Sequence, residues 1–178
     1  MTSVFLDFEF TSLSQAAIPI SMGLIAENGN TFYAEFSGVK TDLLTDWLKE
    51  YVVPQLRFEH IYESAPVLDF EHHAMKADKQ KVAFALQAWL AQFEQVHMWG
   101  DCLAYDWMLF CELWGGAERL PANVFYIPFD LATYLMVKGL DPDVSREEYA
   151  GLAGKKHNAL WDAKVMRAIY FKLLGITA

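Results

Sequence analysis

The chain has few cysteines and no long apolar run, and each absence excludes a class of protein. Cys102 and Cys111 do not form a CxxC pair, so we expect reduced thiols and a cytoplasmic protein. No apolar run approaches the roughly 20 residues that cross a bilayer. The N-terminus has no basic segment ahead of an apolar stretch, so we expect no signal peptide and no membrane association.

Basic residues are also scarce. There are 14 lysines and arginines against 23 aspartates and glutamates, which gives a net charge of −9. This balance argues against a large surface that binds nucleic acid, because phosphates prefer basic surfaces. The objection weakens if several acids are metal ligands, since bound Mg²⁺ would bring positive charge to the place where a phosphate sits.

The size and composition predict one globular domain. The chain has 178 residues, of which 54% are apolar and 21% charged. A chain of this length can bury a substantial core, and we see no internal repeat, low-complexity tract or linker. We therefore expect a single domain over residues 1–178.

Hydrophobic patterning predicts an α/β fold. We expect strands at residues 4–10, 18–26, 31–36, 96–100 and 124–127, and helices at 43–53, 79–93, 105–113, 131–137 and 158–174. Asn28-Gly29 predicts the hairpin turn between the second and third strands. We expect loops around a short helix at 54–76 and a mobile loop at 139–156. An antiparallel meander followed by parallel strands, flanked by helices, predicts a mixed sheet compatible with a ribonuclease H-like fold.

Asp7 and Glu9 lie within an otherwise apolar strand. Residues two apart on a strand share a face, so both carboxylates should point the same way and could bridge cations. The alternative is an edge strand with a solvated acidic face. The residues around the acids are apolar on both faces of the strand, which favours a buried position: Val4, Phe5, Leu6, Phe8 and Phe10.

Asp106 begins an apolar helix. Alone it has a simpler explanation, since an acid in the first turn of a helix interacts favourably with the helix dipole. Asp101, in the turn after the preceding strand, is expected to cap or orient that loop. Converging buried carboxylates are nevertheless best explained by a divalent cation.

His157 and Asp162 are five residues apart. On one continuous helix their side chains would be about 140° apart and could not share a site. Asn158 is a good N-cap, which places His157 on the incoming loop and Asp162 near the first turn. The alternative is a surface histidine beside an acid that complements the helix dipole.

Together these segments resemble the three motifs of the DEDDh 3′–5′ exonucleases, which have a ribonuclease H-like fold. The matching pieces are DxE at Asp7 and Glu9, the aspartate at Asp106, and HxxxxD in HNALWDAKV from His157 to Asp162. The phrases ISMGLIAENG and AYDWMLFCELWG look most like the small bacterial stand-alone 3′–5′ exoribonucleases. Two positions depart from the usual pattern: Cys102 stands where many relatives have asparagine, and Ser12 where many have glycine.

The resemblance implies a mechanism and a substrate. Four carboxylates would hold two Mg²⁺ or Mn²⁺ ions, His157 would act as general base, and a nucleoside 5′-monophosphate would leave from the 3′ end of RNA. Phe10, Thr11 and Ser12 would touch the terminal sugar and base. The resemblance also implies a homodimer. The carboxylate ligands would be Asp7, Glu9, Asp106 and Asp162.

Several readings remain open. Lys155 and Lys156 either contact the phosphate backbone of a substrate or are solvated loop charges. Trp107 and Trp161 are expected to pack in the core. The alternatives for the whole chain are a 3′–5′ exodeoxyribonuclease, an inactive ribonuclease H-like binding module, and a metal-dependent phosphatase or small-nucleotide hydrolase.

Overall fold

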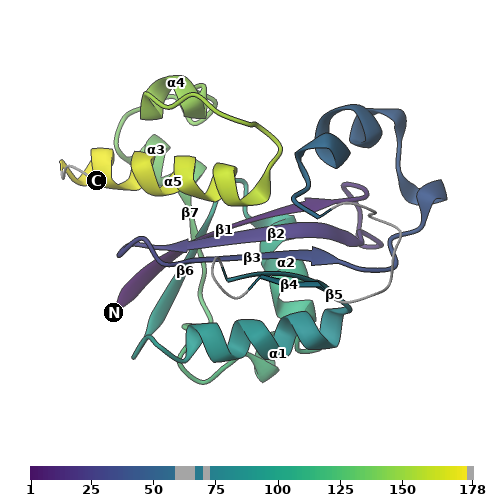
Figure 1. Ribbon diagram of the computed structural model, residues 1–178. Helices are drawn as coiled ribbons and strands as arrows, with labels where there is room; N and C mark the ends of the chain where they lie inside the picture. Colours follow the sequence, from purple (N-terminus) through teal and green to yellow (C-terminus); the bar gives the residue numbers. More distant parts are fainter. Residues whose placement is uncertain (59–66, 70–72, 176–178) are drawn as a thin grey trace.

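A mixed sheet organises the fold. The computed structural model describes residues 1–58, 67–69 and 73–175. The described strands are β1 (Thr2–Phe10), β2 (Pro19–Ala26), β3 (Thr31–Phe36), β4 (Val67–Asp69), β5 (Ala74–Ala77), β6 (Val96–Gly100) and β7 (Phe129–Asp130). They form a 7-stranded sheet in the order β4-β5-β3-β2-β1-β6-β7 (Figure 1).

The strand directions confirm the predicted fold class. β1, β2 and β3 form an antiparallel meander. β6 then pairs parallel to β1, and β7 pairs parallel to β6. On the other side β5 pairs parallel to β3, and β4 pairs antiparallel to β5. This α/β arrangement is consistent with a ribonuclease H-like fold.

Helices cover both faces of the sheet (Figure 1). The α-helices are α1 (Lys79–Leu90), α2 (Ala104–Glu112), α3 (Leu131–Val137), α4 (Arg146–Ala150) and α5 (Ala159–Leu174). α5 packs on β1 and β2, and α3 and α4 pack on α5. α1 packs on β3 and β5 and α2 packs on β1, over the opposite face.

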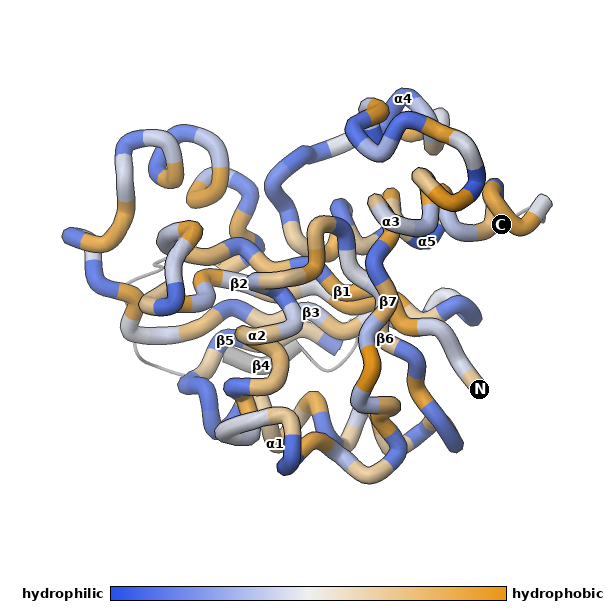
Figure 2. Tube along the Cα trace, turned by 180° about the vertical axis from the view of Figure 1, so that it is seen from behind, coloured by the Kyte–Doolittle hydropathy of each residue, from blue (hydrophilic) through white to orange (hydrophobic). Residues whose placement is uncertain are grey.

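Alternation along β1 divides its side chains between these two faces. Val4, Leu6 and Phe8 belong to the core shared with α1 and α2, whereas Phe5 belongs to the core beneath α3 and α5. Figure 2 shows hydrophobic and hydrophilic residues alternating along the strands. Because Asp7 and Glu9 follow Phe5 at intervals of two, they point to the face that α5 covers.

α5 lies directly on the sheet at Gly23 of β2. A Cβ atom at this glycine would come 2.2 Å from the backbone nitrogen of Leu160 and 2.4 Å from the carbonyl carbon of Ala159. No side chain fits in that space, so glycine permits the close approach. The contact fixes the first turn of α5 against the centre of the sheet.

The segment between β3 and β4 is less regular than the single helix predicted at 43–53. It contains a 3₁₀ turn (Thr41–Leu43), a π-helical turn (Leu48–Val52) and a second 3₁₀ turn (Val53–Gln55). Pro54 lacks an N–H and interrupts the helical hydrogen bonding. A small apolar cluster joins this segment to β2: Ile20, Val39, Leu44, Leu48 and Val52.

Three other predictions need correction. Within 54–76, where loops were expected, β4 and β5 form strands, while residues 59–66 and 70–72 lie outside the described part of the chain. The predicted strand at 124–127 is reduced to a bridge from Val124 to Val96, and Pro128 precedes the observed β7. The predicted loop at 139–156 contains α4, capped by Ser145, whose side chain accepts from the Glu148 amide.

Two findings concern the cysteines and the apolar character of the helices. Both cysteines are free thiols. None of the described helices has the length and apolar character needed to cross a membrane.

Candidate active site

The predicted site residues converge on one cavity. It has a volume of about 630 Å³ and lies where the C-terminal ends of β1 and β6 meet the first turns of α2 and α5. In open α/β sheets, ligands bind at the carboxyl ends of parallel strands. The sequence-predicted residues that line this cavity are Asp7, Glu9, Phe10, Asp106, Lys156, His157 and Asp162.

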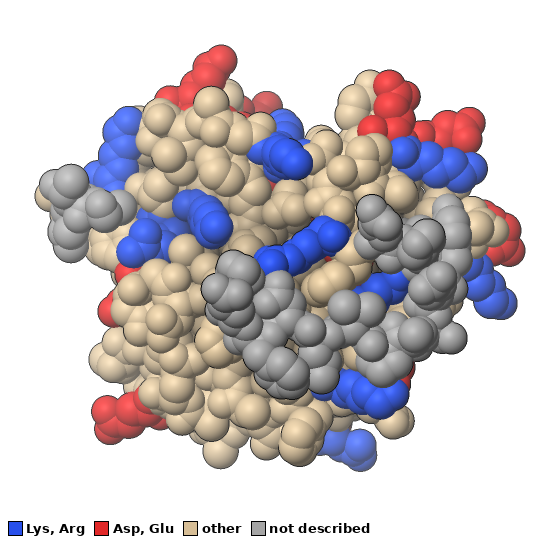
Figure 3. Space-filling view, in the orientation of Figure 1, with Lys and Arg blue, Asp and Glu red and all other residues tan. Residues whose placement is uncertain are grey.

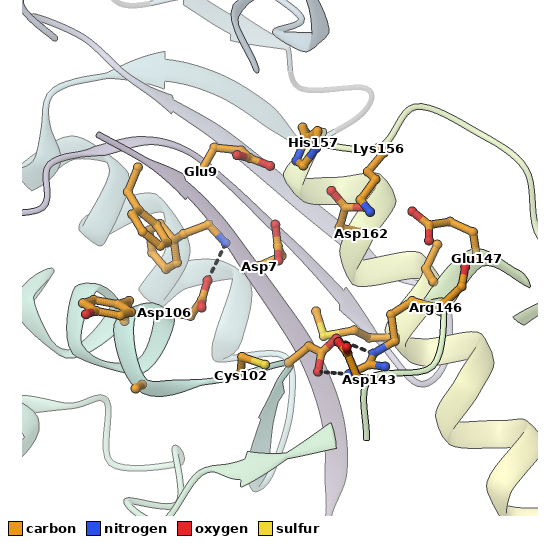
Figure 4. A pocket seen from close by; sticks show the side chains of 18 of the residues that line it. Asp7, Glu9, Cys102, Asp106, Asp143, Arg146, Glu147, Lys156, His157 and Asp162 are labelled. Atoms are coloured by element: carbon orange, nitrogen blue, oxygen red, sulfur yellow. Dashed lines mark hydrogen bonds and ion pairs between the residues drawn. The ribbon is translucent and has the colours of Figure 1, made fainter. Parts of the chain in front are cut away.

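Three of the carboxylates form a compact group. Asp7, Glu9 and Asp162 each offer an oxygen, and these atoms lie within 4.8 Å of one another. Asp7 and Glu9 come from β1 and Asp162 from the first turn of α5. Figure 4 shows them turned toward one another in the cavity. Oxygen donors at this spacing could hold a hard divalent cation.

Asp106 approaches from the opposite side. It lies in the first turn of α2 and is buried. Its Oδ1 accepts a hydrogen bond of 2.8 Å from the backbone N–H of Phe8, which ties α2 to β1. In Figure 4, Asp7 lies between Asp106 and Asp162. Asp106 therefore lines the same cavity, although the compact group within 4.8 Å comprises the other three acids.

Burial, and then repulsion between neighbouring acids, shifts the pKa values of all four acids upward. Burial raises the pKa of Asp7 well above its ordinary value, and repulsion by Asp106, Asp162 and Glu9 adds to the shift. The pKa of Glu9 rises to about 8 because of burial and then repulsion by Asp162 and Asp106. Burial also raises the pKa values of Asp106 and Asp162 to about 7. A bound cation would relieve the repulsion between these buried acids in their ionised form.

His157 lies at the position predicted for it, on the loop that enters α5. Asn158 caps the helix, and its side chain accepts from the Trp161 amide at 3.1 Å. His157 has φ 64°, a left-handed conformation that places its ring beside the acids (Figure 4). Burial lowers the pKa of His157, the Lys156 cation lowers it further, and Glu147 opposes them.

An aromatic contact holds the His157 ring, a feature that the sequence reasoning missed. The ring packs edge-on against Trp47, with centroids 4.8 Å apart, and Tyr51 lies 6.4 Å away. The side-chain amide of Asn158 also donates to the Gln55 carbonyl at 2.8 Å. The segment from Trp47 to Gln55 thus forms a wall of the site beside the histidine.

A smaller cavity of about 400 Å³ adjoins the first and is lined by Glu9, Phe10, Thr11, Ser12 and Trp47, among others. The Phe10 ring packs against Tyr105 of α2, with centroids 5.8 Å apart. The Thr11 hydroxyl accepts from the Ile18 amide at 3.0 Å, and the Ser12 hydroxyl lies 2.9 Å from that of Ser14. The three residues predicted to touch substrate therefore line one hollow next to the acids.

Asp101 was expected to cap or orient the loop after β6, and among the described residues it caps no backbone N–H there. The amide of Leu103 donates to Asp130 instead. Asp101 forms a two-pronged ion pair with Arg146, at 2.6 Å from Nε and 3.0 Å from Nη2. The remaining guanidinium bonds go to the carbonyls of Val144 and Pro142. The pair fastens the loop before α4 to the end of β6, at the wall of the main cavity.

The two tryptophans beside the acids pack as predicted. Trp107 is partly buried against the core and stacks on Phe110, with centroids 5.4 Å apart. Trp161 is partly buried against the core beneath α3 and α5.

With this geometry established, comparison with known proteins adds one likeness. The chain is similar to two proteins named 3′–5′ exoribonuclease. They come from two strains of Mycobacterium tuberculosis, and each is 25% identical to this chain over 122 residues. The match covers 67% of this chain and 66% of each relative, so the chain spans just under two thirds of their length. No model of a known protein family matches the chain.

Proposed function

We propose that this protein is a metal-dependent 3′–5′ exoribonuclease that releases nucleoside 5′-monophosphates. The observation that carries the proposal is the convergence of Asp7, Glu9 and Asp162 within 4.8 Å, in a cavity that Asp106 and His157 also line. The names of the two relatives support the same activity. The resemblance of the DxE, Asp and HxxxxD motifs to the DEDDh exonucleases supports the assignment of roles.

The donor set fits two Mg²⁺ or Mn²⁺ ions. The ligands would be Asp7, Glu9, Asp106 and Asp162, all of which offer hard carboxylate oxygens. Zn²⁺ is less suitable, because it usually recruits cysteine or several histidines. The raised pKa values of Glu9 and Asp162 fit this role, because a cation relieves the repulsion between their charges. When bound, such ions supply a low-pKa water and stabilise charge on the phosphate and the leaving oxygen.

His157 is the proposed general base. The lowered pKa keeps an imidazole nitrogen unprotonated near neutral pH, so it can accept the proton of the attacking water. Attack at phosphorus forms a new P–O bond and breaks the bond to the 3′-oxygen of the preceding nucleotide. The released product keeps the phosphate at its 5′ position, and the shortened RNA has a new 3′-hydroxyl.

The second cavity is the proposed place of the terminal nucleotide. Phe10, Thr11 and Ser12 line it directly after Glu9, so a sugar and base held there would put the adjoining phosphate at the acids. Lys156 lines the main cavity and would offset the negative charge of that phosphate. Acids outnumber Lys156 and Arg146 in the lining of this cavity, so bound metal ions would supply most of the positive charge that the phosphate needs.

A time course on labelled oligonucleotides tests this proposal. Matched single-stranded RNA and DNA carry a label at the 5′ or the 3′ end, and each is incubated with Mg²⁺, with Mn²⁺ or with EDTA. We expect the 3′ label to appear at once as nucleoside 5′-monophosphate, the 5′-labelled RNA to shorten stepwise, and EDTA to stop both. Asp7→Asn should abolish turnover by removing a ligand while retaining the shape of the side chain.

Three results would contradict the proposal. Shortening from the 5′ end would reverse the direction, and faster loss of DNA than RNA would favour the exodeoxyribonuclease. Absence of hydrolysis with both Mg²⁺ and Mn²⁺ would favour a binding module.

A further inference from the structure

Three lysines next to the site form no ion pair, hydrogen bond or ring contact with any residue that the structure describes. Most basic residues form ion pairs, hydrogen bonds or ring contacts, as Arg146 does with Asp101. Over residues 1–58, 67–69 and 73–175, the basic residues without such a contact are Lys40, Arg119, Lys155, Lys156 and Lys164. The last three lie within one short stretch, 155–164, which also carries His157 and Asp162. On a chain with a net charge of −9, this concentration of positive charge calls for a physical explanation.

The three lysines border two different hollows. Lys156 lines the main cavity, where the acids lie. Lys155 and Lys164 line a separate cavity of about 280 Å³, together with Asn158, Leu160 and Trp161. Different residues of the same segment, 154–164, therefore line the two cavities.

The turn at 154–158 is held firmly against α5. Gly154 lies so close to Trp161 that a Cβ atom there would be 2.2 Å from the indole ring. Asn158 caps α5 through the Trp161 amide and donates to the Gln55 carbonyl at 2.8 Å. Lys164 lies one helical turn after Leu160, on the same side of α5. The bases of Lys155 and Lys164 are therefore fixed beside one cavity.

The charge distribution of the surrounding face agrees with this location. Figure 3 shows lysine and arginine side chains along α5 and across the middle of the face, with acidic side chains chiefly at its margins. Both Lys155 and Lys164 are exposed. An exposed ammonium without a carboxylate partner is free to bind an anion from outside the chain.

We propose that Lys155 and Lys164 bind the sugar–phosphate backbone of single-stranded RNA on the 5′ side of the nucleotide being removed. This inference rests on the proposed function, because it requires a 3′ end at Asp7, Glu9 and Asp162. The RNA leaves the main cavity past Lys156 and crosses the turn, and its phosphates then meet the two ammonium groups. Ammonium groups bind phosphates through charge without reading the bases, so the site favours longer substrates regardless of sequence.

The test compares two double variants with the same change in net charge. Lys155→Gln with Lys164→Gln removes the proposed site, and Lys40→Gln with Arg119→Gln removes unpaired charges that line none of the three cavities described. For each we measure kcat/KM in Mg²⁺ on an RNA of about twelve nucleotides and on a dinucleotide, at several salt concentrations.

We expect the first variant to lower the ratio of kcat/KM between the long and short substrates by about tenfold. The slope of log kcat/KM against log salt for the long RNA should become shallower by about 1.4, because two phosphate contacts are lost. The control variant should match the wild type in both respects. Lys155→Arg with Lys164→Arg retains the charges and should restore the ratio, which distinguishes charge from misfolding.

An unchanged ratio in the first variant would overturn the inference and leave the proposed function intact. An equal loss in the control variant would also overturn it, because the effect would then come from net charge alone. If the wild type hydrolyses neither substrate, the proposed function fails, and this inference fails with it.

Discussion

Asp7 lies between carboxylates from two helices and shares its strand with a third, and burial together with this crowding decides how the site responds to pH. In the folded chain the pKa of Glu9 is raised to about 8 and those of Asp106 and Asp162 to about 7. In the unfolded chain, aspartate and glutamate side chains have pKa values of about 4. The folded state therefore binds protons more tightly than the unfolded state across the neutral range.

A raised carboxyl pKa contributes stability that is complete below the unfolded pKa and is lost as the pH rises through the folded pKa. Without divalent cations, we expect the melting temperature to fall between about pH 5 and about pH 9. Added Mg²⁺ should raise it more at the alkaline end, where the acids are ionised. Thermal melts in EDTA and in Mg²⁺ measure this difference, and Glu9→Gln should show a weaker dependence. A Mg²⁺ effect of equal size at both ends would contradict the account.

His157 gives a second prediction at this scale. His157→Asn should lower kcat by about 10²–10⁴-fold, because asparagine cannot accept the proton of water. The Mg²⁺-induced rise in melting temperature should persist, since His157 is not a proposed metal ligand. His73→Asn is a matched control: His73 is exposed and also has a positive φ, 46°, a conformation that asparagine tolerates. Comparable kcat values for the two variants would show that His157 is not the general base.

The placement of Asp7, Glu9 and His157 could be predicted because local rules decide it. Strand alternation puts Asp7 and Glu9 on one face, and the Asn158 cap puts His157 before α5. The Asp101–Arg146 pair could not be predicted, because 45 residues separate its members and no periodic pattern links them. The contact of His157 with Trp47 depends likewise on long-range packing.

Among the elements, the loop before α4 is joined to the end of β6 by a partly buried ion pair. Arg146 and Asp101 are only 18% and 20% exposed, and the guanidinium also bonds two carbonyls of the loop. A partly desolvated charge that loses its partner is costly, whereas an exposed pair contributes little.

Asp101→Asn should therefore lower the free energy of unfolding by about 1–3 kcal/mol, since the Arg146 cation keeps its burial and loses its counter-charge. Urea denaturation measures the change. Asp46→Asn is the control, because Asp46 pairs with Lys49 at 3.4 Å while fully exposed, and we expect no measurable effect there. Similar losses in both variants would show that burial of the Asp101 pair does not matter.

Elements with strong local signals were predicted well. The β2–β3 hairpin turns where Asn28-Gly29 predicted it, and β3, β6 and α3 have the predicted bounds. The turn type differs from the predicted type I′, because the Gly29 amide donates to the Ala26 carbonyl and only Gly29 of the pair has a positive φ, 92°. β5 was missed because it is short and carries Lys76, which interrupts the apolar pattern even though it is buried. The sequence contains a local signal for α4, the capping-box pattern from Ser145 to Glu148. A loop was predicted instead because the surrounding residues are rich in charge and glycine.

Over the whole molecule, the negative charge and the proposed substrate are compatible because the charges are unevenly placed. Acids concentrate in a cavity that cations would neutralise, and the unpaired lysines lie beside it. The homodimer implied by the resemblance stays a prediction, which light scattering coupled to gel filtration measures. Lys155 and Lys164 binding the RNA backbone, as proposed, would reduce the need for basic residues from a partner subunit.

The central claim is that these carboxylates bind divalent cations at the reaction centre. Anomalous X-ray scattering from crystals soaked in Mn²⁺ with a nucleoside 5′-monophosphate tests it most directly. We predict anomalous peaks among Asp7, Glu9, Asp106 and Asp162, with the phosphate of the nucleotide against them. Saturating Mn²⁺ that gives no peak at these acids, or peaks only elsewhere on the chain, would contradict the account.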